Sequence, residues 1–298
     1  MKTVLFLGAG YSARAAINRA KAAGWRTIGT TRDAAKLPSL ASAGCEALIF
    51  DGESVSDDLK VAMSSANAVV ISIAPDRGSS ASDPVLGVFG EIIQTSGHLR
   101  HVCYLSTIGV YGDFGGAWID ETAETHPTSA RGQARVRAET AWREMAKQSD
   151  GRWRVHILRL AGIYGPSRNP IARIRNGTAR AIIKPGQVFN RIHVADIASA
   201  IMAGLDGRGT HDVYNVTDNE PAPPEDVIFH AAELIGAPRP RPIPFEAADL
   251  TPMARSFYSD VKRVKNTRLC EDLGVTLRYP SRGAVKSWLD WRDRLTLV

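Results

Sequence analysis

The sequence of 298 residues predicts an α/β fold, a doubly wound parallel sheet with a smaller C-terminal domain. Three observations support this. Short β-branched or apolar runs alternate with longer helical patterns through the first half of the chain, which is typical of a parallel sheet covered by helices on both faces. A glycine-rich turn follows the first apolar run. After Gly165, prolines and glycines become frequent and the alternation of strands and helices loosens.

Six strands are expected in the first half of the chain. They cover residues 3–7, 26–31, 47–51, 68–74, 101–106 and 154–160. Between the first two strands, small apolar residues recur at helical spacing up to Gly24, a glycine of the kind that ends helices. Further helices are expected over residues 55–66, 84–96 and 129–148.

Two domains are expected, a nucleotide-binding domain over residues 1–165 and a smaller substrate domain over 166–298. The division is not expected to be clean. IHVADIASAIMAGL predicts a helix and HDVYNVT a strand, so segments near 192–217 should return to the sheet. The tail SRGAVKSWLDWRDRL predicts a terminal amphipathic helix anchored by Trp288, Leu289 and Leu295.

Composition limits the class of protein. The formal charge of +6 and pI near 9.3 are compatible with nucleic-acid binding. The basic residues are spread along the chain without a recognition motif, so a small anionic substrate is the favoured explanation and no nucleic-acid partner is expected. No apolar run approaches the roughly 18 residues of a membrane span. We therefore expect a soluble protein without a membrane partner.

The three cysteines indicate the compartment. Cys45, Cys103 and Cys270 lie far apart and form no CxxC pair. Neither a disulfide framework nor a metal site is expected, and a reducing cytoplasm fits this cysteine usage.

The stretch VLFLGAGYSARAA predicts a cofactor site. Gly8, Gly10 and Ala13 fit the GxGxxG/A pattern that opens a Rossmann sheet: the first glycine allows a tight turn, the second lets backbone approach a pyrophosphate, and Ala13 allows close packing. Tyr11 and Ser12 then begin a helix whose free N–H groups attract phosphate. The pattern predicts a bound dinucleotide.

The end of the second strand, TIGTTRD, bears on which dinucleotide binds. An acidic residue there would hydrogen-bond the ribose of NAD, whereas an arginine accommodates the 2′-phosphate of NADP. Arg32 favours NADP over NAD. A solvated surface arginine is the alternative, and Asp33 beside it leaves NAD open.

Five further motifs, LSTIGVYG, LAGIYGP, RIHVADIA, YNVTDNEP and KRVKN, follow in order. With them the chain resembles the extended short-chain dehydrogenase/reductase superfamily, in its NAD-dependent epimerase/dehydratase-like branch, over nearly its whole length. The resemblance implies that Asp51 binds the adenine and that Ala74 and Pro75 lie along the cofactor. It also implies cofactor contacts at Ser106 and at the turn formed by Gly162, Ile163 and Tyr164. The hydroxyl of Thr107 would hydrogen-bond a substrate carbonyl or carbinol.

The chain departs from this family at the catalytic YxxxK pair. In PTSARGQARVRAE, Arg131 stands where the tyrosine is expected and Arg135 where the lysine is expected. A guanidinium stays protonated throughout the useful pH range, so Arg131 cannot be a conventional acid or base. Arg135 could still donate to the nicotinamide ribose. The two cations would favour an anionic substrate group, unless both point into solvent.

Another residue would then have to move the proton. Tyr111, four residues after Thr107, is the first substitute and Tyr164 the next. The pair Tyr258 and Lys262 matches YxxxK literally, but it lacks the preceding strand and is interpreted as a chance match. His193 is expected to bond backbone.

The residues expected to bind the substrate also depart from the family pattern. Phe189 occupies the place of an arginine that holds the pyrophosphate of nucleotide sugars, and Arg191 is shifted toward the histidine. Two functions stay open: an atypical NADP(H)-dependent oxidoreductase or epimerase acting on a small carbonyl or carbinol compound, and a non-catalytic NADP(H)-binding sensor or regulatory protein. By analogy with the family, the helices near 84–96 and 129–148 could form a homodimer.

Overall fold

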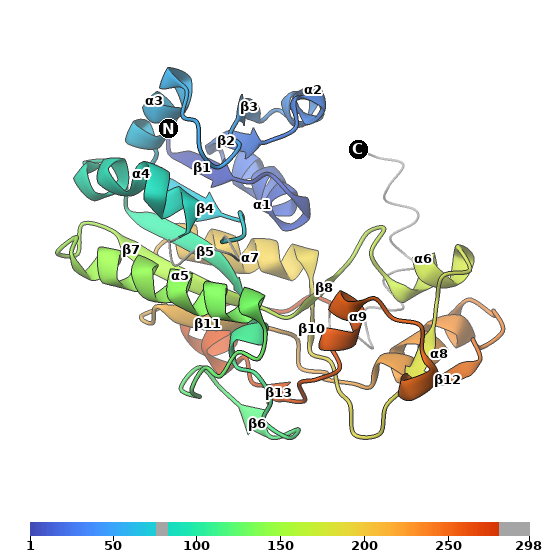
Figure 1. Cartoon of the computed structure of the whole chain (residues 1–298). Helices are drawn as coiled ribbons and strands as arrows, with labels where there is room; N and C mark the ends of the chain where they lie inside the picture. The colour runs from blue at the N-terminus through green and yellow to red at the C-terminus, as the bar shows by residue number, and fades with distance from the viewer. Residues whose placement is uncertain (76–82, 280–298) are drawn as a thin grey trace.

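A parallel seven-stranded sheet forms the centre of the computed structural model, which describes residues 1–75 and 83–279 (Figure 1). The strand order is β11-β7-β5-β4-β1-β2-β3, and every adjacent pair is parallel. The strands are β1 (Thr3–Leu7), β2 (Arg26–Thr31), β3 (Glu46–Ile49), β4 (Ala68–Ile71), β5 (His101–Thr107), β7 (Arg154–Leu160) and β11 (Val213–Val216). The doubly wound α/β prediction is confirmed.

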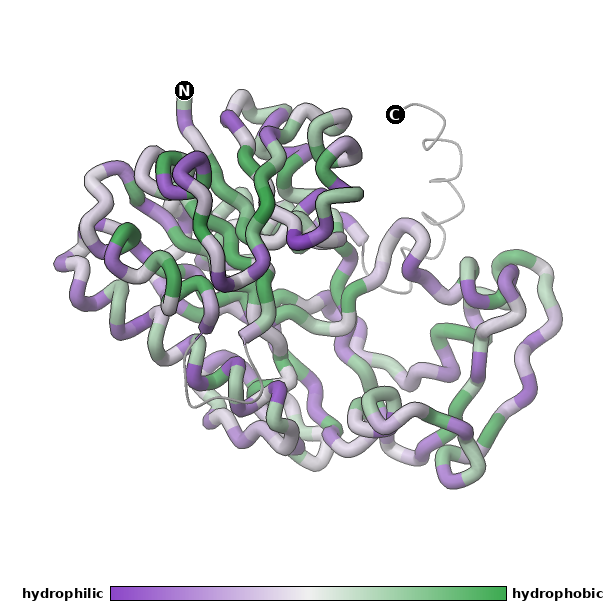
Figure 2. Tube along the Cα trace, turned by 45° about the horizontal axis from the view of Figure 1, so that its top comes forward, coloured by the Kyte–Doolittle hydropathy of each residue, from purple (hydrophilic) through white to green (hydrophobic). Residues whose placement is uncertain are grey.

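Helices cover both faces of this sheet. One face carries α1 (Tyr11–Ala22) and α7 (Val194–Leu205), and the other carries α3 (Asp57–Ser65), α4 (Pro84–Thr95) and α5 (Ala130–Lys147). Each face has its own buried apolar cluster, and Figure 2 shows the hydrophobic residues concentrated along the strands between them. Strands β1 and β4 are buried on both sides and are therefore continuous apolar runs, whereas the edge strand β3 is partly exposed.

The helices begin where the sequence supplies suitable caps. Ser56 caps α3, Asp83 caps α4 and Ser129 caps α5, each by accepting a backbone N–H with its side chain. Helix α1 differs because Gly10 precedes it and no side chain caps it. Its first N–H groups therefore remain available to a ligand.

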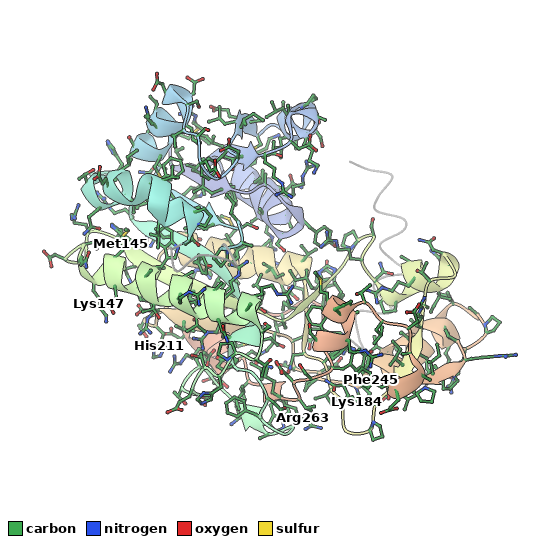
Figure 3. All side chains as sticks on the ribbon, viewed as in Figure 1. Met145, Lys147, Lys184, His211, Phe245 and Arg263 are labelled. Atoms are coloured by element: carbon green, nitrogen blue, oxygen red, sulfur yellow. The ribbon has the colours of Figure 1, made fainter. Side chains whose placement is uncertain are left out.

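A second group of elements lies beside the sheet, at the lower right of Figure 1. It contains α6 (Pro170–Arg175), β9 (Ala181–Ile183), α8 (Pro224–Leu234), β12 (Pro242–Pro244) and α9 (Pro252–Ser256). Strands β9 and β12 pair with each other, and small apolar clusters hold the group together. Figure 3 shows Lys184 beside Phe245 there, with the ammonium 5.2 Å from the ring centroid. We call this the outlying group.

Two short strand pairs lie outside the central sheet. Strand β8 (Gly162–Tyr164) pairs with β10 (Arg191–His193), and β6 (Trp118–Ile119) pairs with β13 (Arg263–Val264). Asn190 fixes β13 in place: its amide donates to the Lys262 carbonyl over 2.9 Å, and its Oδ1 accepts from the Val264 N–H at 2.9 Å. Distant parts of the chain are thus joined beside the carboxyl ends of the sheet strands.

The sequence-based element boundaries differ from the structure by a few residues. Strands β1, β2 and β7 match exactly, β4 ends three residues early at Ile71, and β5 extends to Thr107. The segment 194–216 returns to the central body through α7 and β11. A short helix, α2 (Leu37–Ser42), was not expected. The terminal helix expected over residues 281–295 lies outside the described residues. Within 1–75 and 83–279, none of the helices has the length and apolarity needed to span a membrane.

Candidate functional site

Gly8 forms the tight turn between β1 and α1. Its φ of +92° lies in the region that favours glycine, and a Cβ there would come within 3.0 Å of Ile73 Cγ1 and 3.3 Å of the Ile73 nitrogen. The Gly8 N–H donates to Thr30 Oγ1 over 2.9 Å. Ile73, two residues after the end of β4, therefore lies close against the turn, and a larger residue at position 8 would have to displace it.

Gly10 has the opposite surroundings. A Cβ built on Gly10 would meet nothing within 4 Å, so open space lies beside this backbone. Helix α1, which follows, starts without a side-chain cap. Ala13, in its first turn, is fully buried. An uncapped helix N-terminus beside open space fits a pyrophosphate, because unpaired N–H groups and the positive end of the helix dipole both favour an anion. We call this region, from Gly8 to Ala13, the cradle.

Tyr11 brings a distant arginine to the cradle. The Tyr11 hydroxyl donates to the Pro166 carbonyl over 2.8 Å, and the Arg168 guanidinium lies 4.3 Å from the centroid of its ring. Burial raises the pKa of Tyr11 to about 12. Gly165 permits this approach, since a Cβ there would lie 2.8 Å from the Tyr11 hydroxyl. Arg168 was not among the predicted site residues, because only the fold brings it to Tyr11 and no local pattern indicates it.

Two arginines lie in the segments that follow β1 and β2: Arg14 in α1, and Arg32 directly after β2. Arg32 is exposed and makes no hydrogen bond or ion pair with any residue that the structure describes. Its neighbour Asp33 is occupied, because it accepts from the Ala35 N–H at 3.1 Å and lies 3.4 Å from the Lys36 ammonium. Arg14 Nη1 donates to Ser39 Oγ over 2.9 Å. Both guanidinium groups thus keep donors for a further anion.

The acidic residue after β3 is held by local backbone. Asp51 is exposed, and its Oδ1 accepts from the N–H groups of Glu53 at 2.9 Å and Ser54 at 2.8 Å. These bonds lower the pKa of Asp51. Ala74 and Pro75 lie in the loop after β4, which ends at Ile71, and close the first described range.

A buried ion pair contacts the end of β5 through Ser106. Ser106 donates its hydroxyl to Glu139, whose other oxygen lies 2.7 Å from Arg159 Nη2. The side chains of Glu139 and Arg159 are only 5% and 8% exposed. Ser106 thus supports the strand end from inside. Thr107 Oγ1 accepts from the Gly109 N–H at 3.1 Å, which leaves its O–H free to donate.

Arg131 and Arg135 both lie on α5 but make different contacts. Arg135 Nη1 donates to the Leu105 carbonyl over 2.5 Å and to the Tyr104 hydroxyl over 3.1 Å, so it is fixed against β5. Arg131 lies over the ring of Phe257, which follows α9. Neither guanidinium simply extends into solvent.

Tyr111, the residue expected to move the proton, is buried in the structure and its hydroxyl is already engaged. It is 0% exposed, its hydroxyl donates to Asn215 Oδ1 over 2.7 Å, and burial raises its pKa. The Arg159 guanidinium lies 4.7 Å from its ring. Tyr164, the second candidate, is also buried with its hydroxyl bonded to the Tyr279 carbonyl. Its neighbours Gly162 and Ile163 remain less buried, in β8.

The YxxxK match at Tyr258 and Lys262 is structural. Lys262 Nζ donates to the Gly112 carbonyl over 2.5 Å. Tyr258 instead packs between Phe189 and Phe245, with ring centroids 5.1 and 5.0 Å away. The tyrosine thus belongs to the apolar cluster of the outlying group, while the lysine ties β13 to the loop after Tyr111.

Two residues of the RIHV segment are also held by backbone. His193 Nδ1 accepts from the Ala195 N–H at 3.2 Å and caps α7, and burial lowers the pKa of His193 to about 4. Arg191 Nη1 donates to the carbonyls of Phe189 at 3.0 Å and Ala222 at 3.2 Å. These contacts are part of the scaffold below the site.

Comparison with known proteins gives a consistent picture. The model of the NAD dependent epimerase/dehydratase family matches residues 4–217. Protein YeeZ of Escherichia coli (strain K12) is 27% identical over 289 residues, which cover 94% of this chain and 97% of YeeZ. A protein of unknown function from Silicibacter pomeroyi is 46% identical with a TM-score of 0.87, covering 97% of this chain and 99% of that one.

A solved enzyme structure shares the fold at low identity. The dTDP-glucose 4,6-dehydratase from Bacillus anthracis, in complex with NAD, is 15% identical with a TM-score of 0.73, and the match covers 99% of this chain and 97% of that one.

Proposed function

Because the chain belongs to the NAD dependent epimerase/dehydratase family, we propose that it binds a nicotinamide dinucleotide across the carboxyl ends of its sheet strands. The observation that carries this proposal is the open space beside Gly10 at an uncapped helix N-terminus. The pyrophosphate would accept from the first N–H groups of α1, at Tyr11 and Ser12. Asp51, Ala74 and Pro75 would line the adenosine half, and Gly162 and Ile163 the nicotinamide half.

NADP(H) is proposed in preference to NAD(H). Arg32 is exposed and unengaged, and its only acidic sequence neighbour is occupied by Ala35 and Lys36. A 2′-phosphate would find a free, permanently charged donor here, since guanidinium pairs well with phosphate. Arg14, held at Ser39, would add a second cation.

The proposed activity is that of an oxidoreductase or epimerase acting on a small carbonyl or carbinol compound. The dinucleotide, when bound, supplies or accepts the hydride. Thr107 would donate its free hydroxyl to the substrate oxygen, and Arg135, fixed at Leu105, would use its remaining donors toward the ribose. With Tyr111 buried, water would carry the proton. The outlying group would hold the substrate, and Arg131 beside it would favour an acidic one.

A non-catalytic NADP(H)-binding role is the second candidate. It is favoured by the arginines at the YxxxK positions, which bind anions but transfer no proton near neutral pH. The contacts of Arg135 with Leu105 and Tyr104 fix it as a scaffold residue whether or not chemistry follows. A sensor of the cofactor's redox state would need only the cradle.

Calorimetry with NADPH and NADH tests the cofactor proposal. Gly10 has a φ of −80°, and a larger side chain there would meet no protein atom, so Gly10→Leu should fold normally and fill the cradle. We expect the native protein to bind NADPH and this variant to lose binding at least tenfold. Gly97→Leu, also in open space and exposed, is the matched control. Equal binding by the native protein and Gly10→Leu would overturn the proposal.

Hydride transfer separates the two candidate functions. Loss of NADPH absorbance with any member of a panel of aldehydes, ketones and keto acids would favour the enzyme. Tight NADPH binding without turnover across the panel would favour the regulatory role.

A further inference from the structure

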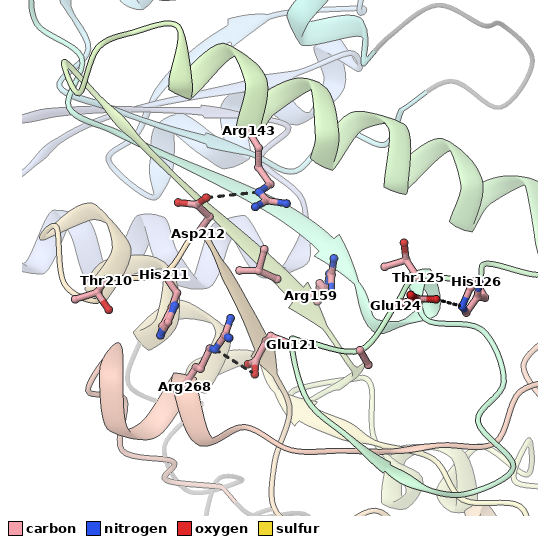
Figure 4. Close-up of a pocket in the computed structure, with 12 residues that line it drawn as sticks. Glu121, Glu124, Thr125, His126, Arg143, Arg159, Thr210, His211, Asp212 and Arg268 are labelled. Carbon is pink, nitrogen blue, oxygen red and sulfur yellow. Dashed lines mark hydrogen bonds and ion pairs between the residues drawn. The ribbon is translucent and has the colours of Figure 1, made fainter.

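A polar hollow opens at the edge of the sheet opposite the cradle. It has a volume of about 650 Å³ and is bounded by α5, β7, the start of β11, the loop over residues 121–126 and η4 (Arg268–Asp272) (Figure 4). Strands β5 and β4 separate β7 from β1, and the hollow shares no residue with the cradle. It is therefore distinct from the proposed dinucleotide site.

Three arginines from three elements meet at this hollow. Figure 4 shows the guanidinium groups of Arg143 from α5, Arg159 from β7 and Arg268 from η4 facing it from different sides. His126, His211 and the hydroxyls of Thr125 and Thr210 add further polar groups to the lining. Residues so far apart in sequence meet here only because of the fold.

Arg159 is the buried member of this set. Its side chain is 8% exposed, and its Nε and Nη2 donate to Glu139. Its Nη1 has no hydrogen-bond partner among residues 1–75 and 83–279. A buried guanidinium nitrogen without an acceptor costs free energy, and a ligand oxygen would relieve that cost.

Arg143 and Arg268 also retain most of their donors. Arg143 Nε lies 3.5 Å from Asp212, and Arg268 Nε lies 3.8 Å from Glu121, so neither contact is a close hydrogen bond. Within the described part of the chain, no hydrogen bond from either guanidinium is present. Each guanidinium has five N–H donors, so the three arginines offer more donors than the neighbouring carboxylates accept.

The three carboxylates that line the hollow, those of Glu121, Glu124 and Asp212, each already contact a neighbouring residue and leave most of these donors unused. Glu121 Oε1 already accepts from the Asn215 N–H at 2.8 Å, and burial raises the pKa of Glu121. Glu124 pairs with His126 over 3.0 Å at the exposed rim. The interior is therefore richer in donors than in acceptors.

We propose that this hollow is a binding site for a small anion carrying a phosphate or carboxylate group. The planar forks of Arg143 and Arg268 would bind its oxygens from two sides, and Arg159 Nη1 would donate from the floor. The volume lies in the range of small-molecule sites and exceeds the need of a lone phosphate, so a small organic phosphate or polycarboxylate fits.

Inorganic phosphate and citrate are the probes for this site, each titrated into the full chain at constant ionic strength and followed by calorimetry and thermal unfolding. The native protein should bind at least one of them saturably and unfold at a higher temperature in its presence. Arg143→Gln with Arg268→Gln should weaken binding at least tenfold. Arg137→Gln, an exposed arginine of the same helix outside the hollow, should bind as the native protein does.

Three outcomes would overturn the proposal. One is the absence of saturable binding of both probes by the native protein. Another is equal binding by the native and doubly substituted proteins. The third is binding that NADPH abolishes and the double substitution leaves intact, because the anion would then occupy the cradle. None of these depends on whether the protein has the proposed activity.

Discussion

The guanidinium carbon of Arg131 lies 5.3 Å from the ring centroid of Phe257. This contact joins the first turn of α5 to the residue that follows α9. Phe257 is 52% exposed, so the contact lies at the surface. Arginine over an exposed ring contributes about 0.5–1 kcal/mol, which a better ligand could displace. The Arg131 guanidinium therefore lies near the proposed site in a weak contact that a bound ligand could replace.

Restoring the family pair should restore proton transfer. We expect Arg131→Tyr with Arg135→Lys to raise NADPH-dependent reduction of a carbonyl substrate at least about tenfold, since a positioned proton donor contributes 10²–10⁴-fold in enzymes. The measurement is the loss of NADPH absorbance. Arg131→Phe with Arg135→Lys is the control, because it differs only by the hydroxyl. Equal rates for these two double variants would contradict the assignment of residue 131 to the tyrosine position.

Arg168 should contribute to dinucleotide binding. Its guanidinium lies on the Tyr11 ring at the start of α1, where the charge would act on a pyrophosphate. We expect Arg168→Gln to raise the Kd for NADPH and NADH alike by about fivefold, or roughly 1 kcal/mol, and to reduce the salt dependence of binding. Arg175→Gln, an exposed substitution in α6, should leave both unchanged. An unaltered Kd in Arg168→Gln would exclude this role.

Arg32 should select the phosphorylated cofactor. Losing a charge-assisted bond to phosphate costs about 1.5–3 kcal/mol, so Arg32→Gln should weaken NADPH binding at least about tenfold while NADH stays within about twofold. Calorimetry with each cofactor measures the ratio. Lys60→Gln, another exposed cation, is the control. If both cofactors weaken equally, Arg32 does not contact a 2′-phosphate.

Two buried histidines should make the fold sensitive to acid. Burial lowers the pKa values of His156 and His193 to about 4. The unfolded chain takes up these protons near pH 6.5, so the stabilisation is complete above that pH and is lost as pH falls toward 4. Lowering the pKa of a histidine from near 6.5 to about 4 corresponds to about 3 kcal/mol for each residue. Urea unfolding between pH 7.5 and 4.5 should show this fall.

His156→Gln should make that fall less steep, because one of the two groups no longer titrates. The exposed substitution His98→Gln provides the comparison. A His156→Gln variant with the full native pH dependence would show that the burial of His156 is not its source.

The ion pair under β5 should be essential to stability. Removing one partner of a buried pair leaves the other charge uncompensated, so Glu139→Ala should cost about 3–5 kcal/mol in unfolding free energy. Glu144→Ala, which breaks an exposed pair with Lys147 on the same helix, should cost less than about 1 kcal/mol. Urea denaturation measures both. Similar costs would show that Arg159 finds another partner or water.

The sequence predicted the sheet well because its signals are local. Buried parallel strands such as β7 and glycine turns such as that at Gly8 are defined by neighbouring residues, and their boundaries were found to within three residues. Pairings such as β6 with β13 join residues 145 positions apart, for example Trp118 with Arg263, and no local pattern indicates them.

The site residues show the same limit. Proximity of Tyr111 to Thr107 in sequence suggested a shared site, yet the 3-10 turn η2 (Ile108–Val110) directs Tyr111 into the core toward Asn215. Arg168 was missed for the converse reason, because only the fold brings it to Tyr11. Sequence placed residues near the site but did not show which way their side chains turn.

The pairing of β6 with β13 also bears on the order of events during synthesis. Chains grow from the N-terminus, so Trp118 and Ile119 must wait for some 145 further residues before their partners leave the ribosome. The hydrogen bond that the Gly112 carbonyl accepts from Lys262 likewise cannot form until Lys262 has been synthesised. The loop beside the proposed catalytic centre can therefore gain these contacts only after residues 262–264 have been synthesised, well after the strands β1 to β5.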